Sequence, residues 1–119
     1  MYGASMVNPN FMNGVPELLI LRLLEEREMY GYEIVAAIRA KTADAISLGE
    51  GVVYPVLHAL EREGALKSRR KAVNGRTRVY YTVTKKGETR LAGLVRQWTH
   101  ITDSVNRAIR EPGHVAVTI

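Results

Sequence analysis

The first half of the chain carries two stretches in which apolar residues recur every three or four positions, the period of an amphipathic helix. Residues 15–26 read VPELLILRLLEE, and Pro16 suits the first helical position because its missing N–H would have no partner there. Residues 29–42 read MYGYEIVAAIRAKT and predict a second helix, which Gly31 separates from the first. The side chains expected to face the core are Val15, Leu18, Leu19, Leu23 and Leu24 in the first helix and Tyr32, Val35, Ala36 and Ile38 in the second.

A third helix is predicted over residues 52–64, VVYPVLHALEREG, after a glycine-containing turn at 43–51. Gly64 is a common residue at a helix end. Pro55 is expected within the first turns, because it forfeits the hydrogen bond to the carbonyl of Gly51. The helix has two faces, an apolar one with Val53, Leu57 and Leu60 and a polar-aromatic one with Tyr54, His58 and Arg62.

The period then changes to the alternation of a β-strand. Residues 65–73 and 76–83 flank Asn74-Gly75, and Val79, Tyr81 and Val83 alternate with more polar neighbours. Two β-rich arms around Asn-Gly are the strongest short-range signal for a hairpin, because both turn residues need positive φ. The sequence therefore predicts a β-hairpin with its tip at residues 74–75.

A long helix is predicted from about residue 85 to 110, with Thr84 as its N-cap. Its apolar positions follow the 3-4 spacing of a heptad seam: Leu91, Leu94, Trp98, Ile101, Val105 and Ala108. At 1.5 Å per residue the helix is about 40 Å long, more than so small a domain can cover. We therefore expect the seam to bind a second copy of the chain, with Leu91, Leu94, Trp98, Ile101 and Val105 as dimerisation residues.

Three short helices followed by a basic hairpin predict an α+β, mostly α fold: a winged helix-turn-helix with a long C-terminal dimerisation helix. The expected divisions are a flexible N-terminal arm (1–14), a DNA-binding domain (15–83), the dimerisation helix (84–111) and a tail (112–119). The length of 119 residues suits one such domain.

Charge supports nucleic acid as the partner. Residues 67–78 hold six Lys or Arg residues and no acidic residue, although the net charge of the whole chain is only +5. On a wing such cations neutralise DNA phosphates, and the third helix enters the major groove. The residues expected to contact double-stranded DNA are Tyr32, Tyr54, His58, Arg69, Lys71, Asn74, Arg76 and Arg78. For Tyr32 a place in the core is the alternative, and Lys67 at the base of the wing is a weaker candidate.

The composition argues against several other classes. There is no Cys, which fits a reducing cytoplasm, and three scattered His residues give no metal-ligand cluster. The sequence has no nucleophile motif, no paired catalytic carboxylates and no phosphate-binding glycine loop, so neither an enzyme nor a cofactor is expected. No apolar run reaches the roughly 18 residues of a membrane span. A winged module that binds protein or RNA without operator specificity is the alternative that stays open.

Several short motifs occur in one order along the chain. These are Tyr30-Gly31-Tyr32-Glu33-Ile34; Gly51, Tyr54-Pro55, Leu57, Leu60 and Gly64; and Tyr80-Tyr81 with Thr84 and Gly87. In this order they resemble the PadR-type transcriptional regulators over residues 15–110. The resemblance implies a homodimeric regulator, a repressor, on a near-palindromic operator.

The single C-terminal helix resembles the short PadR subfamily that includes the multidrug-binding regulator LmrR. In such proteins a Trp on the last helix lines a cavity at the dimer interface, and Trp98 lies at the matching position. The resemblance implies that Trp98 stacks on a small aromatic or hydrophobic effector, while the simpler alternative is a Trp that fills the dimer core. The chain departs from the family at residues 49–52, where Gly-Glu-Gly-Val replaces a hydroxyl-containing start of the third helix.

Overall fold

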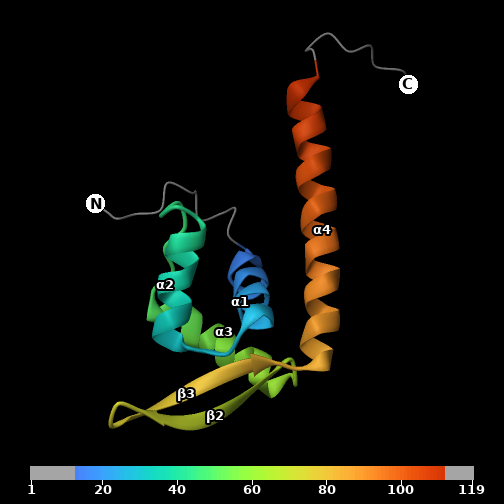
Figure 1. Ribbon diagram of the computed structural model, residues 1–119. Helices are drawn as coiled ribbons and strands as arrows, with labels where there is room; N and C mark the ends of the chain where they lie inside the picture. The colour runs from blue at the N-terminus through green and yellow to red at the C-terminus, as the bar shows by residue number, and fades with distance from the viewer. Residues whose placement is uncertain (1–12, 112–119) are drawn as a thin grey trace.

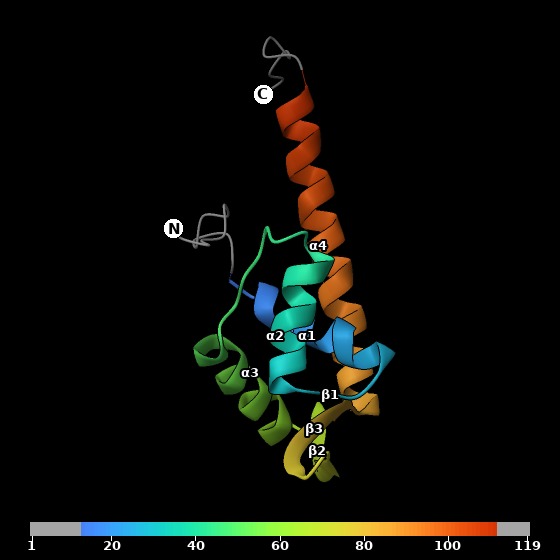
Figure 2. The same cartoon turned by 60° about the vertical axis from the view of Figure 1, so that its left-hand side comes forward.

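The computed structural model describes residues 13–111 as three short helices above a small sheet, with one long helix standing beside them (Figures 1 and 2). The elements are α1 (Val15–Glu26), β1 (Met29–Tyr30), α2 (Gly31–Lys41), α3 (Glu50–Arg62), β2 (Leu66–Val73), β3 (Arg76–Val83) and α4 (Lys85–Arg110). The predicted fold class, a mostly helical winged helix-turn-helix with a long C-terminal helix, is confirmed. The predicted tail, and the predicted arm apart from Asn13 and Gly14, lie outside the described residues.

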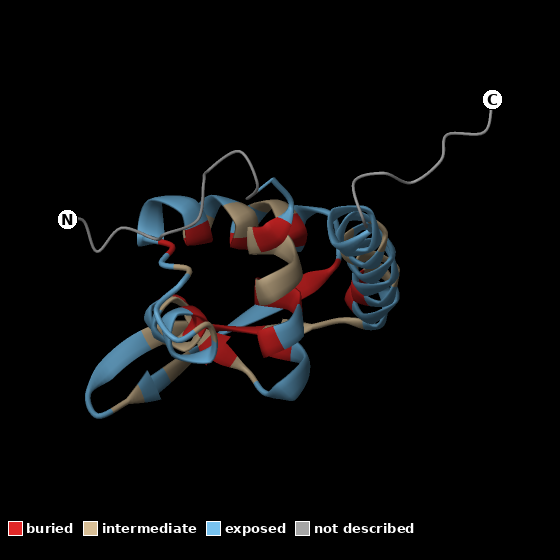
Figure 3. Ribbon diagram, turned by 90° about the horizontal axis from the view of Figure 1, so that it is seen from above, coloured by how far each residue is buried: buried red, intermediate tan, exposed pale blue. Residues whose placement is uncertain are grey.

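One core holds the three short helices and the base of α4 together. Figure 3 shows the buried residues facing the centre of the helical cluster, whereas the hairpin tip and most of α4 are exposed. The core side chains with at most 1% exposure are Ile20, Leu21, Ile34, Ile38, Val53, Leu57 and Ala65. Each α3 residue predicted to face inward is buried.

The predicted inward face of α2 is wrong at two positions. Tyr32 is 63% exposed and Ala36 is also exposed, whereas Ile34 is fully buried. The helix begins at Gly31 rather than near residue 29, because Met29 and Tyr30 form a short strand instead. This later start leaves Tyr32 in the first turn, where it faces away from the core.

The sheet is antiparallel with the order β1-β3-β2, and β1 was not predicted. Met29 pairs with Tyr81 and Tyr30 with Tyr80, so the chain segment between α1 and α2 closes one edge of β3. The predicted hairpin is confirmed, with φ of 53° at Asn74 and 77° at Gly75. In the register that follows from this turn, Arg69 lies opposite Tyr80 and Lys71 opposite Arg78.

The long helix α4 begins where the sheet ends. The side chain of Thr84 accepts a hydrogen bond from the Gly87 N–H at 3.1 Å, which confirms the predicted N-cap. Near its base, Arg90 forms ion pairs with Glu17 of α1 and Glu63 at the end of α3. The C-terminal part of α4 extends beyond the three short helices (Figure 1).

Candidate nucleic-acid interface

Helix α3 is fixed by its apolar face, and this orientation decides which side chains it presents outward. Val53, Leu57 and Leu60 are buried in the core, so His58 on the other side is exposed. Pro55 is the sixth helical residue, inside the second turn, so the helix lacks the hydrogen bond to the Gly51 carbonyl. The helix therefore holds its polar-aromatic face outward on a rigid support.

Tyr54 is half-buried rather than fully outward. Its ring lies against the backbone of Gly31, and a Cβ at Gly31 would approach the Tyr54 Cε1 to 2.8 Å and overlap the hydroxyl. The ring centroid of Tyr54 lies 6.1 Å from that of His58. A glycine at the start of α2 thus lets the two helices approach and sets the position of the Tyr54 phenol.

A groove lies between α3, the start of α2 and β3. It brings together five of the eight residues predicted to contact DNA: Tyr32, Tyr54, His58, Arg76 and Arg78. Its remaining walls come from Tyr30, Glu50, Thr77, Val79 and Tyr81. Residues from three separate segments of the chain therefore meet on one surface, with aromatic and imidazole groups on the helical side and guanidinium groups on the strand.

Aromatic contacts position Arg78 beside this groove. The Arg78 Cζ lies 4.2 Å from the centroid of the Tyr30 ring, within the range of a cation–π interaction. The Tyr30 and Tyr80 rings in turn meet edge to face, with centroids 5.4 Å apart. The unpredicted strand β1 supplies Tyr30, so it contributes directly to the arrangement of a predicted site residue.

The other predicted cations of the hairpin lie elsewhere. Arg69 and Lys71 both bind the carboxylate of Glu28, at 2.9 Å and 2.7 Å, and neither lines the groove. The hydrogen bond from Lys71, with a further contribution from Arg69, lowers the pKa of Glu28. Asn74 is exposed at the hairpin tip. The sequence pattern did not single out Glu28, because nothing local links it to cations about 40 residues away.

The C-terminal helix carries an exposed apolar stripe. Trp98 is 48% exposed, Ile101 57% and Val105 50%, and the stripe also includes Val95 and Ile109, which were not predicted. Leu91 is only 3% exposed and already belongs to the core of its own chain. Leu94, Trp98 and Ile101, together with α1, line a small hollow of about 140 Å³.

Metal sites and membrane spans are absent from residues 13–111. No group of three or more potential metal ligands occurs within this range. None of its helices is both long enough and apolar enough to cross a membrane.

Known proteins resemble the chain in sequence and in fold. The family model described as "Transcriptional regulator PadR-like family" matches residues 20–93. A curated transcriptional regulator from Mycobacterium tuberculosis is 30% identical over 81 residues, which cover 68% of this chain and 73% of the relative. An uncharacterised protein from Lysinibacillus sphaericus is 30% identical over 102 residues, which cover 85% of this chain and 94% of the relative.

Solved structures agree with this assignment. A transcriptional regulator from Clostridium thermocellum has a TM-score of 0.79 and 28% identity, over 86% of this chain and 97% of that one. A PadR-like regulator from Bacillus cereus has a TM-score of 0.76 and 28% identity, over 87% and 99% of the two chains. The family match covers more than half of the chain, and these relatives are regulators rather than enzymes. The chain belongs to the PadR-like family and is a DNA-binding transcriptional regulator.

Proposed function

We propose that the chain is a cytoplasmic, homodimeric repressor that recognises a near-palindromic operator. In this proposal residues 15–83 form the DNA-binding head and residues 84–111 the dimerisation helix. The observation that carries the proposal is the groove between α3 and β3, where two guanidinium groups face a polar-aromatic helix surface. Such a surface combines cations that bind phosphates with side chains able to contact base edges.

On DNA, α3 enters the major groove and the hairpin lies along the backbone beside it. Tyr32, Tyr54 and His58 then reach base edges, because they project from the two helices at the groove. Arg76 and Arg78, with Asn74 at the tip, reach phosphates. The first three residues account for the choice of sequence, and the hairpin residues account for sequence-independent affinity.

Dimerisation uses the exposed stripe of α4. Trp98, Ile101 and Val105 are about half exposed and form an apolar stripe along one helix, and such exposed apolar surfaces mark interaction sites. Packing against a second copy removes this surface from water and places two heads side by side. In helix-turn-helix dimers the two recognition helices are about 34–36 Å apart, one turn of DNA.

The proposal also includes a small aromatic or hydrophobic effector that binds beside Trp98. Trp98 stands beside a hollow of about 140 Å³, smaller than the roughly 300–1,000 Å³ of a typical ligand pocket, so a partner chain would have to complete the site. A flat aromatic molecule would stack on the indole ring. Release from DNA requires only that the molecule bind more tightly to a dimer whose heads have the wrong spacing.

Binding to the DNA upstream of the chain's own gene tests the regulator. We expect a specific complex at moderate salt, with log K falling by about 0.9 per unit of log salt for each phosphate neutralised. A protein-binding or RNA-binding module would give no specific complex with that duplex. Absence of the complex would therefore refute operator recognition.

Two variants separate sequence-independent affinity from sequence recognition. Arg76→Ala is expected to weaken binding to operator and random duplex alike and to make the salt slope shallower. Tyr54→Phe keeps the ring against Gly31 but removes the hydroxyl, and is expected to weaken operator binding more than random binding. Equal losses on both duplexes would show that the Tyr54 hydroxyl does not read sequence.

The dimer and the effector have separate tests. Ile101→Glu places a charge in the exposed stripe and is expected to yield monomers in sedimentation experiments, whereas an unchanged mass would contradict the proposed interface. Trp98 is the only Trp in the chain, so its fluorescence reports the proposed effector site alone. Fluorescence that does not respond to a series of flat aromatic cations would remove the support for an effector there.

A further inference from the structure

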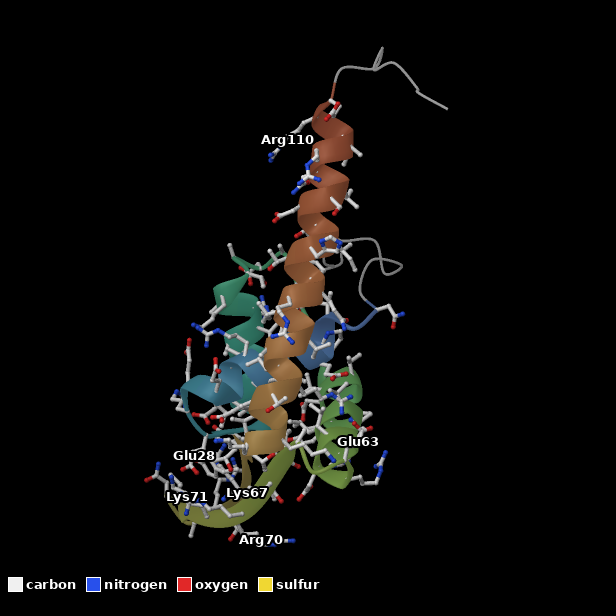
Figure 4. The ribbon with its side chains drawn as sticks, turned by 90° about the vertical axis from the view of Figure 1, so that its right-hand side faces the viewer. Glu28, Glu63, Lys67, Arg70, Lys71 and Arg110 are labelled. Carbon is white, nitrogen blue, oxygen red and sulfur yellow. The ribbon has the colours of Figure 1, made fainter. Side chains whose placement is uncertain are left out.

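Glu28, in the segment between α1 and β1, binds two cations of the hairpin that were expected to contact DNA. Figure 4 shows Glu28 close to Lys71, with Arg70 directed away from them at the lower edge of the hairpin. No other hairpin cation forms an ion pair with a carboxylate among the described residues. The hairpin cations therefore form two groups: Arg69 and Lys71 pair with Glu28, and the others pair with no carboxylate in residues 13–111.

The Glu28 carboxylate uses nearly all of its hydrogen-bond acceptor positions. Arg69 donates from Nε to Oε1 at 3.1 Å and from Nη2 to Oε1 and Oε2 at 3.0 and 2.9 Å, and Lys71 donates from Nζ to Oε2 at 2.7 Å. A carboxylate has about four acceptor positions, and bidentate charge-assisted bonds to Arg are among the strong ones. The Lys71 Nζ also lies 4.6 Å from the centroid of the Tyr80 ring.

The two sets of cations differ in where they can act. Arg76 and Arg78 line the groove beside α3, whereas Arg69 and Lys71 do not. Cations that contact phosphates away from base edges add the same affinity to every duplex and carry no sequence information. If Arg69 and Lys71 were free, they would raise non-specific binding more than they would help the protein choose its operator.

We propose that Glu28 is a positioning residue, which holds Arg69 and Lys71 on its carboxylate and so keeps the sequence-independent part of the DNA affinity low. The inference rests on the proposed function, sequence-specific DNA binding. Glu28 acts through the two cations and does not itself touch DNA. It competes with phosphate for their N–H groups, and phosphate must break four hydrogen bonds to engage both.

A purely structural role for Glu28 makes the opposite prediction. If the cluster served only to brace the hairpin, its loss would loosen β2 and weaken binding to all DNA. The direction of change on random duplex thus separates the two roles.

The test compares Glu28→Gln with Glu26→Gln as a matched control. Glu26 also loses one negative charge in that variant, but its partners are Lys41 at 3.1 Å and Arg22 at 3.3 Å, on α2 and α1. Both variants therefore change the net charge equally, and only Glu28→Gln frees hairpin cations. Affinities for the operator and for a random duplex of equal length are measured over a range of salt concentrations.

We expect Glu28→Gln to bind both duplexes more tightly than Glu26→Gln does, with the ratio of operator to random affinity unchanged, because the freed cations carry no sequence information. Freeing one or two cations should make the slope of log K against log salt steeper by about 0.9 to 1.8. The triple variant Glu28→Gln, Arg69→Gln, Lys71→Gln should return to the wild-type slope, because it removes the freed cations.

Two results overturn the inference. The first is a Glu28→Gln variant that matches Glu26→Gln in slope and in affinity for random duplex. The second is a Glu28→Gln variant that binds both duplexes more weakly, as the bracing role predicts. Failure of the wild-type protein to prefer its operator would instead refute the proposed function, so the two failures are distinguishable.

Discussion

Replacing Gly31 by Ala tests whether the start of α2 fixes the position of Tyr54. The added Cβ would overlap the Tyr54 hydroxyl and come within 2.8 Å of Cε1, whereas carbon atoms pack best at about 3.5–4.0 Å. Tyr54 belongs to α3, whose Val53 and Leu57 neighbours are fully buried, so the helix cannot simply shift away. The phenol, which already lines the groove, must instead rotate out of its present position.

The expected loss of stability follows from two opposing effects of the substitution. Overpacking of this kind costs about 1–3 kcal/mol. Replacing Gly by Ala in a helix stabilises the helix by up to about 1 kcal/mol. The clash outweighs the gain in helix stability, so Gly31→Ala should lower the free energy of unfolding by about 1–2 kcal/mol, or Tm by about 4 °C per kcal/mol for a chain of this size.

A double-mutant cycle with Tyr54→Ala isolates the contact. Without the phenol, the Gly31→Ala change should be neutral or stabilising by up to about 1 kcal/mol, giving a coupling energy of about 1–3 kcal/mol. Urea unfolding at one fixed protein concentration measures each variant, since dimerisation makes stability concentration-dependent. Gly51→Ala is the control, because a Cβ at Gly51 in α3 meets nothing within 4 Å.

A Gly31→Ala variant as stable as Gly51→Ala would refute the clash, as would an effect of the same size with and without the Tyr54 phenol. Where the clash is present, operator affinity should also fall more than random-duplex affinity, because the displaced phenol no longer holds its position on the proposed reading surface.

Three further predictions concern the base of the fold. Gly87→Ala should cost more than Gly31→Ala, because its Cβ would overlap the backbone carbonyl of Ala65, which cannot rotate away; thermal unfolding of the two variants side by side checks the order. Arg90→Gln removes the ion pairs that join α4 to α1 and α3. Because the Arg90 side chain is 37% exposed, this loss should lower the free energy of unfolding by only about 1 kcal/mol. An effect that does not shrink in 1 M salt would contradict an ionic origin. Burial raises the pKa of Tyr81 above its usual 10, so the stability that its neutral phenol contributes is fully present below pH 10 and is lost as the pH rises through the folded-state pKa. Tyr81→Phe should therefore lose less stability than wild type as the pH is raised above 10, and the same dependence of the free energy of unfolding on pH in both proteins would exclude this titration.

Local signals in the sequence predicted a large part of this fold. The Asn74-Gly75 turn and the Thr84 cap were correct because each depends on only a few neighbouring residues. The helix α4, predicted from about 85 to 110, is observed as Lys85–Arg110 because its apolar period is long and uninterrupted. Five of the predicted contact residues also meet at one groove, since the fold places α3 beside β3.

The elements that were missed depend on contacts between distant residues. Strand β1 has two residues and exists only through its pairing with Tyr80 and Tyr81, so no local period could reveal it. Because of that strand, α2 starts later than predicted, and Ile34 rather than Tyr32 is buried in the core. The Glu28 cluster has the same origin, because its partners come together only when β1 and β2 flank β3.

The strand order β1-β3-β2 leaves the outer edge of β2 without a partner strand in the described part of the chain. An open edge of eight residues can pair with the same edge of another molecule, the first step of strand-mediated aggregation. Four of those eight residues are Lys67, Arg69, Arg70 and Lys71. Glu28 partly neutralises Arg69 and Lys71, so Lys67 and Arg70 carry most of the charge that repels an approaching copy. The cations of the hairpin thus also protect the protein's solubility while it is away from DNA, and variants that neutralise them have to be checked for self-association before a loss of binding is attributed to phosphate contacts.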